Sequence, residues 1–136
     1  MKKATIYVTV FLSYSIANVI FYKAISGWYE TQLLNMRHDP LIGWILLLFL
    51  IYSFSLSFFA VFPAAREHSI SCGAIRGAIL GFATYAMFDF GVYSHFDGIS
   101  LSFVAVNLTW GTLVSAVCAT VAVSIALALH PREQPA

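Results

Sequence analysis

Apolar residues gather in four long stretches of this chain, separated by short segments that are richer in polar residues. The stretches are Ala4–Ile25, Leu41–Phe62, Ala74–Tyr93 and Leu101–Leu129. A helix needs roughly 20 mostly apolar residues to cross the hydrocarbon core of a bilayer, because each residue adds about 1.5 Å. All four stretches reach this length. The pattern therefore predicts an integral membrane bundle of four helices.

The composition agrees with this prediction and argues against other classes of protein. Of the 136 residues, 60% are hydrophobic and 10% are charged, and the mean hydropathy is +0.84. A soluble domain carries about a quarter charged residues. No segment between the stretches is long enough for a second domain, so residues 1–136 are predicted to form one all-α transmembrane domain. The net charge of +1 offers no basic surface for nucleic acid.

The cations are distributed unevenly between the two sides of the predicted bundle. The amino end, the second loop and the tail carry five of the seven: Lys2, Lys3, Arg66, Arg76 and Arg132. The first and third loops carry the other two, Lys23 and Arg37. Lys and Arg near helix ends stay on the cytoplasmic side. We therefore expect both termini and the Pro63–Gly73 loop to be cytoplasmic.

Two features near the first helix affect its predicted limits. Its apolar run is too long for the core of a cleaved signal peptide, which predicts an uncleaved helix. The loop that follows, Ser26–Pro40, is the longest connection, and its Gly27–Met36 segment mixes apolar and polar residues at near-helical spacing. This segment is predicted to lie flat in the headgroup region as an interfacial helix, with Trp28 and Tyr29 as interface anchors.

Small residues indicate where two of the helices meet. Lipid tails are as apolar as leucine, so close packing and interhelical hydrogen bonds must hold membrane helices together. The third helix carries Gly73, Gly77 and Gly81 at a spacing of four, and the fourth carries Gly111 and Ser115. A short loop joins these helices and makes them antiparallel neighbours. The pattern predicts a closely packed hairpin of the third and fourth helices.

Polar side chains on three helices fall at a similar depth. Asp89, Asn107 and Asn18 each lie about 6–11 Å below the outer interface when depth is counted at 1.5 Å per residue. Tyr85 lies one turn inside Asp89, and Trp110 follows Asn107 by three positions. In one interpretation the layer only holds the helices in register through hydrogen bonds, each worth about 0.6 kcal/mol. In the other, it binds a small polar group or passes a proton, because carboxyl groups inside membranes mark such sites.

No metal or cofactor site is expected from the remaining residues. Cys72 and Cys118 are not in a CxxC or other metal-ligand spacing. His38 and Asp39 share the predicted outer side with His95 and Asp97, where they could approach as a pH-sensitive or metal-binding pair. The interpretation that we favour is that they are ordinary polar residues of the loops. The usual local signatures of nucleophilic, zinc and nucleotide chemistry do not occur in the sequence.

Three segments resemble a known family. Residues 59–64 read F-A-V-F-P-A, residues 77–85 read G-A-I-L-G-F-A-T-Y and lead to Phe88 and Asp89, and residues 107–111 read N-L-T-W-G. They resemble the F-A-V-x-P-A, G-A-x-x-G-F-x-x-Y-x-x-Y-D and D-x-x-W-G stretches of small bacterial four-helix predicted membrane proteins of unknown function. The resemblance covers about half of the chain. It implies the fold and a bacterial inner membrane, without an activity. The chain departs from the pattern at Asn18, Phe88 and Asn107, where the family tends to have Asp, Tyr and Asp.

These observations leave three hypotheses for the function. The first is binding or transport of a small solute or a proton at the polar layer, in a homo-oligomer or after helix movement. The second is an accessory or assembly subunit of a larger membrane complex, because the chain is small, has no soluble domain and is 16% aromatic. The third and weakest is an intramembrane enzyme that acts on a lipid or a quinone, since Asp89 has no paired base, nucleophile or metal. In each case the expected contact is the lipid bilayer, without nucleic acid.

Overall fold

The described part of the structure, residues 2–33 and 40–129, folds into helices joined by short turns. In this computed structural model the elements are α1 (Lys2–Gln32), α2 (Ile42–Leu56), the π-helical turn η1 (Ser57–Val61), α3 (Phe62–Arg66), α4 (Ile70–His95) and α5 (Leu101–Ala128). Because α2, η1 and α3 follow one another without a break, they form one span. Four spans are long and apolar enough to cross a bilayer. This confirms the predicted all-helical, multi-pass membrane protein.

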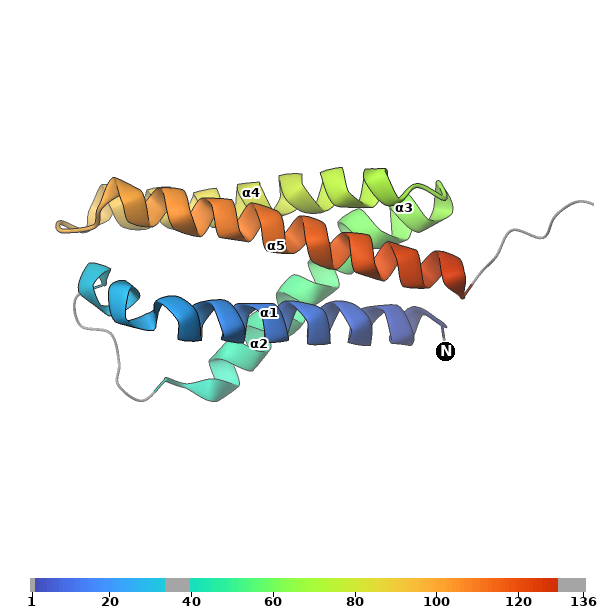
Figure 1. Ribbon diagram of the computed structural model, residues 1–136, viewed down its shortest axis with the longest axis horizontal. Coiled ribbons are helices and arrows are strands. Elements are labelled where there is room, and N and C mark those ends of the chain that lie inside the picture. Colours follow the sequence, from blue (N-terminus) through green and yellow to red (C-terminus); the bar gives the residue numbers. More distant parts are fainter. Residues whose placement is uncertain (1, 34–39, 130–136) are drawn as a thin grey trace, which may run out of the picture.

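The helices form a bundle in which α4 and α5 lie side by side along most of their length (Figure 1). Helix α1 packs along α5, and α2 runs obliquely across α1 before η1 and α3 bring the chain to the start of α4 (Figure 1). The beginning of α1, the α3–α4 turn and the end of α5 therefore lie at one end of the bundle (Figure 1). Which side of the membrane this end faces stays a prediction.

Helix α1 is longer than the apolar pattern predicted. It was expected to end at Ile25, but it continues to Gln32, so Gly27–Gln32 are not part of a separate interfacial helix. Of the rest of that segment, Leu33 lies in a bend after α1, and residues 34–36 are outside the described residues, as are His38 and Asp39. The last turn of α1 contacts the beginning of α5, where the Ser100 hydroxyl donates a hydrogen bond to Gln32. Such contacts favour continued helix in a segment whose hydropathy alone did not require it.

The second span also passes its predicted end, and the next begins early. Pro63 was expected in a loop, but it lies in α3, which continues η1 without a break, so the span passes through a residue that has no N–H to donate. The preceding N–H, that of Phe62, donates to Ser57 O, five residues back. Ser69 then caps α4, because its Oγ accepts a hydrogen bond from the Cys72 N–H at 3.2 Å. The expected Pro63–Gly73 loop is therefore only a short turn between Arg66 and Ile70.

Three glycines of α4 face α5 and allow a close approach of the two helices. A Cβ atom added at Gly73 would lie 2.7 Å from Val123 Cγ2. One added at Gly77 would lie 2.6 Å from Ser115 O. At Gly81 it would lie 2.7 Å from Ser115 Cβ. Real Cβ contacts are longer than these, so larger residues would push the helices apart. The backbone of α5 is thus held close to α4, which places the polar residues of both helices within hydrogen-bonding distance.

Candidate functional site

Among the described residues, Asp89 is the carboxyl group most deeply enclosed by the bundle. Its side chain lies on α4 and is 0% exposed. The Asn107 side chain, on α5 and 5% exposed, donates a hydrogen bond from Nδ2 to Asp89 Oδ1 at 2.5 Å. Asp89 Oδ2 is buried and has no hydrogen-bond partner among the described residues. One oxygen of this carboxyl is thus oriented by the protein, and the other is left with unused hydrogen-bonding capacity.

Tyr29 extends this contact to a third helix. Its hydroxyl, on α1, donates a hydrogen bond to Asn107 Oδ1 at 2.5 Å, and its ring packs on Phe103 of α5 with centroids 4.9 Å apart. The Asn107 amide therefore links the other two residues: its oxygen accepts a hydrogen bond from Tyr29, and its nitrogen donates one to Asp89. We call these three residues the Asp89 group. Tyr29 was expected only as an interface anchor, and the longer α1 explains why it reaches the site.

Asn18, on α1, belongs to a second set of contacts, which includes Tyr85, one helical turn before Asp89 on α4. Asn18 Oδ1 accepts hydrogen bonds from Trp110 Nε1 at 3.1 Å and from the Tyr85 hydroxyl at 3.4 Å. The Tyr85 hydroxyl also hydrogen bonds with the Tyr14 hydroxyl at 2.9 Å. Asn18 Nδ2 donates to the backbone oxygen of Tyr14 at 2.8 Å. We call these four residues the Asn18 group.

The predicted polar layer therefore consists of two groups with different partners. The structure brings Asp89 together with Asn107, and Asn18 together with Tyr85 and Trp110. No hydrogen bond joins Asn18 to Asp89 among the described residues. Depth counting also missed Tyr14, although Tyr14 and Asn18 are four residues apart and so share one face of a helix. That spacing was the available signal.

A hydroxyl pair lies next to the Asn18 group. The Tyr52 hydroxyl, from α2, hydrogen bonds with Ser115 Oγ of α5 at 2.6 Å, and the Tyr52 ring stacks on Tyr14 with centroids 4.5 Å apart. Ser115, selected in the sequence only for its small size, is 0% exposed. Ser53 and Ser57, on the same span as Tyr52, have buried hydroxyls without partners among the described residues. Hydroxyl groups thus continue from the Asn18 group into the bundle.

Gly111 determines where Tyr85 lies. A Cβ atom added at Gly111 would overlap the Tyr85 ring itself, with Cγ, Cδ1 and Cδ2 as the nearest atoms. The ring therefore rests directly on the backbone of α5. This contact holds the Tyr85 hydroxyl near Asn18 and Tyr14, so the glycine positions a polar group as well as allowing close packing.

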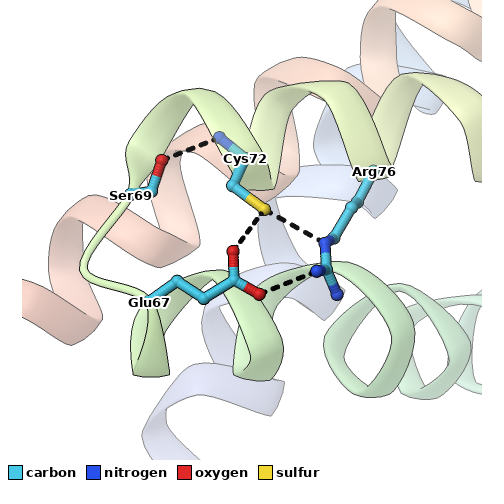
Figure 2. A network of polar contacts seen from close by, with 4 residues as sticks. All are labelled: Glu67, Ser69, Cys72 and Arg76. Atoms are coloured by element: carbon cyan, nitrogen blue, oxygen red, sulfur yellow. Dashed lines mark hydrogen bonds and ion pairs between the residues drawn. The ribbon is translucent and has the colours of Figure 1, made fainter.

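The two ends of α4 differ in how their carboxylates are paired. The described residues contain one ion pair, from Arg76 Nη2 to Glu67 Oε1 at 2.7 Å, and it lies toward the opposite end of α4 from Asp89. Figure 2 shows that Cys72 lies between these side chains: its thiol donates to Glu67 Oε2 at 3.0 Å, and Arg76 Nε donates to its sulfur at 3.0 Å. Asp89 has no such cation, so a charge on it would lack a direct counter-ion within the described residues.

The histidines do not form a metal site in the described part of the chain. His95 is exposed, and its Nδ1 lies 2.8 Å from Gly91 O within its own helix. No group of three or more His, Cys, Asp or Glu residues within ranges 2–33 and 40–129 has the arrangement that a metal ion requires. The predicted approach of His38 to His95 rests on a residue outside those ranges.

A conservative change at Tyr29 tests its contact with Asn107. Tyr29→Phe keeps the ring on Phe103 and removes only the hydroxyl, so the bundle should lose about 0.5–1.5 kcal/mol of stability. Unfolding in mixed detergent micelles measures the loss. Tyr22→Phe is the matched control, because Tyr22 is exposed on the same helix and should have no effect. Equal stabilities of the two variants would show that the hydroxyl contact contributes nothing.

Comparison with known proteins gives one match. A family described as predicted membrane protein (DUF2177) matches residues 3–124, which is most of the chain and includes every residue of the two polar groups. No curated protein and no solved structure matches. The family description agrees with the four membrane-length helices and adds no activity.

Proposed function

We propose that this chain, which belongs to the family of predicted membrane proteins described as DUF2177, binds a proton or a small polar solute at the Asp89 group. In the fuller form of the proposal, binding leads to transport of that proton or solute. The free oxygen of Asp89 is the binding atom, Asn107 orients the carboxyl, and Tyr29 holds Asn107. The hydroxyls of the Asn18 group and of Tyr52 and Ser115 are the next exchange partners.

The observation that carries this proposal is the unpartnered Oδ2 of Asp89. A buried polar atom without a hydrogen bond costs about 1–3 kcal/mol, and ionisable groups within membrane spans are rare and functional. A merely structural carboxyl would be expected to use both oxygens. A ligand that donates a hydrogen bond would give Oδ2 its missing partner, and a proton bound to the carboxyl would remove a charge that has no counter-ion within the described residues.

The surrounding groups suit a proton or a small hydrogen-bonding solute better than a large or apolar one. Tyr14, Tyr85, Tyr52 and Ser115 all carry hydroxyls, which both donate and accept. The 2.9 Å contact between Tyr14 and Tyr85 and the 2.6 Å contact between Tyr52 and Ser115 are short enough to relay a proton by exchange. These contacts support proton exchange within the bundle beside the Asp89 group, although no hydrogen bond among the described residues joins either pair to that group.

The second candidate function is a subunit of a larger membrane complex. It is favoured by a run of aromatic contacts on the outside of the bundle, where Tyr7 stacks on Phe54 and Phe54 on Phe58. Phe54, Phe58 and Phe59 are each more than half exposed and face lipid or a protein partner. Stoichiometric co-purification with another membrane protein after mild extraction would favour this candidate. A monodisperse protein without such a partner would count against it.

Infrared difference spectroscopy of the purified protein in lipid nanodiscs tests the role of Asp89. We expect a carboxyl signal that changes with pH in the wild type, is missing in Asp89→Asn and is retained in Asp97→Asn. Asp97 is the control because it is an exposed carboxyl in the turn between α4 and α5. A spectrum of Asp89→Asn that equals that of the wild type at every pH would contradict the proposal.

Proton movement into liposomes tests the same site by function. With a pH-sensitive dye inside and an imposed ion gradient, the wild type should acidify or alkalise the lumen faster than protein-free liposomes. Asp89→Asn should reduce the rate to that of the empty liposomes, and Asp97→Asn should leave it unchanged. A folded Asp89→Asn protein with the wild-type rate would exclude proton transport through this group.

A further inference from the structure

At the end of the bundle opposite the Asp89 group, a hollow opens between the start of α1, α3 and the end of α5. It has a volume of about 230 Å³. Its lining residues come from each of these helices and from the turn that follows α3: Lys3, Ile6, Phe62, Ala65, Arg66, His68, Ala126 and Leu127. The hollow therefore combines basic side chains with an apolar floor.

The basic side chains at this hollow are available to a ligand. Lys3, Arg66 and His68 are all exposed, and they come from three different segments of the chain. The one ion pair within the described residues uses Arg76 and Glu67 instead. Within those residues, the two strong cations at the hollow have no carboxylate partner, and so they attract an anion from outside the bundle.

The floor of the hollow suits acyl chains. Ile6 is 6% and Ala126 is 3% exposed, so both belong to the buried core. Phe62 and Leu127 pack against that core and form the apolar edge. Helix α1 begins and α5 ends at this level (Figure 1). Because the ends of spanning helices lie near the boundary between hydrocarbon and headgroups, a bilayer around the bundle would place the hollow near that boundary.

We propose that this hollow is a binding site for an anionic phospholipid. Lys3 and Arg66 hold the headgroup phosphate, Arg66 through charge-assisted hydrogen bonds from its planar guanidinium, and His68 borders the site. The upper part of one acyl chain lies on Ile6, Phe62 and Leu127. Basic pockets between transmembrane helices on the cytoplasmic side bind lipid headgroups in this way, and the loop cations predict that this end is cytoplasmic. The proposal is independent of the Asp89 group.

Native mass spectrometry of the full chain in detergent tests the site. The protein is titrated with phosphatidylglycerol and, separately, with phosphatidylcholine, and the fraction that carries one lipid is measured. We expect tighter binding of phosphatidylglycerol by the wild type. Lys3→Gln and Arg66→Gln should each weaken it about fivefold, and the double variant about 25-fold, because each cation near a membrane surface contributes about 1 kcal/mol.

The matched control is Arg76→Gln, which removes the same charge at the same end of the bundle from a residue already paired with Glu67. It should leave phosphatidylglycerol binding within about twofold of the wild type. An equal loss with Arg76→Gln and Arg66→Gln would overturn the proposal, since diffuse surface charge would then explain the binding. Equal binding of both lipids by the wild type would overturn it as well.

Two further arms separate the lipid from its phosphate and guard against misfolding. Inorganic phosphate at the same concentration should not displace phosphatidylglycerol; displacement would show a free-anion site and overturn the lipid assignment. Ala65→Leu fills the hollow and leaves both cations in place. It should weaken phosphatidylglycerol binding in a protein whose helical circular dichroism is unchanged. A folded Ala65→Leu protein with wild-type binding would show that the lipid lies elsewhere.

Discussion

Replacing Gly81 with alanine should destabilise the bundle by about 1–3 kcal/mol, the usual cost of overpacking a tightly packed interface. The new Cβ would lie 2.5 Å from Ser115 Oγ and 2.7 Å from Ser115 Cβ, and closest of all to the carbonyl oxygen of Gly111. That oxygen belongs to the backbone of α5 and cannot rotate away, so α4 and α5 must separate. Unfolding of the purified protein in mixed detergent micelles measures the change.

The control for this prediction is the same substitution on the same helix. A Cβ added at Gly91 has nothing within 4 Å, and alanine favours helix over glycine by about 0.5–1 kcal/mol. Gly91→Ala should therefore be neutral or stabilising, whereas Gly81→Ala should be less stable than the wild type. Equal effects would mean that the close approach of α4 and α5 is not maintained in the folded protein.

Replacing Asn107 with leucine is the second change with a large expected effect. It leaves Asp89, which is 0% exposed, without its one hydrogen bond from a described residue, and it leaves the Tyr29 hydroxyl without an acceptor. Each group left unsatisfied costs about 1–3 kcal/mol, with the larger share from the fully enclosed carboxyl. The same unfolding measurement should show Asn107→Leu to be clearly less stable than the wild type.

A double variant separates the effect of the lost hydrogen bond from the effect of the changed side-chain packing. Replacing both partners of a buried hydrogen bond by apolar groups can be nearly neutral. The combination of Asn107→Leu with Asp89→Leu should thus be more stable than Asn107→Leu alone. If the second change instead added its own full cost, Asp89 and Asn107 would be independent, and the contact between them would not explain the effect.

The number and type of the helices could be predicted from the sequence because the membrane requires them. In hydrocarbon, backbone polar groups must be satisfied within the segment, so a long apolar stretch becomes a helix whatever surrounds it. The limits of the helices could not be predicted as well. Near the interface water can satisfy the backbone, and local partners decide: Gln32 bonds to Ser100, and Ser69 caps α4.

The candidate site shows the same division. Counting residues along each helix placed Asn18, Asp89 and Asn107 at one depth, because the rise of a helix is fixed. The count contains no information on how each helix is rotated or on what it faces. Asp89 therefore met Asn107, while Asn18 met Tyr85 and Trp110. Tyr29 joined Asn107 from a turn of α1 that the apolar pattern had left out.

The sequence by itself determined that this chain is a four-helix membrane protein, and it identified the residues that do not suit lipid. Both conclusions depend on the free energy of transferring single segments from water to hydrocarbon. This free energy is a sum of contributions from the residues of each segment. Only the tertiary structure decided which polar atoms are paired and that Lys3 and Arg66 border one hollow. It also decided that Asp89 Oδ2 has no hydrogen-bond partner within the described residues. These features arise from rotation and crossing of helices, which many side chains set together and no single segment encodes.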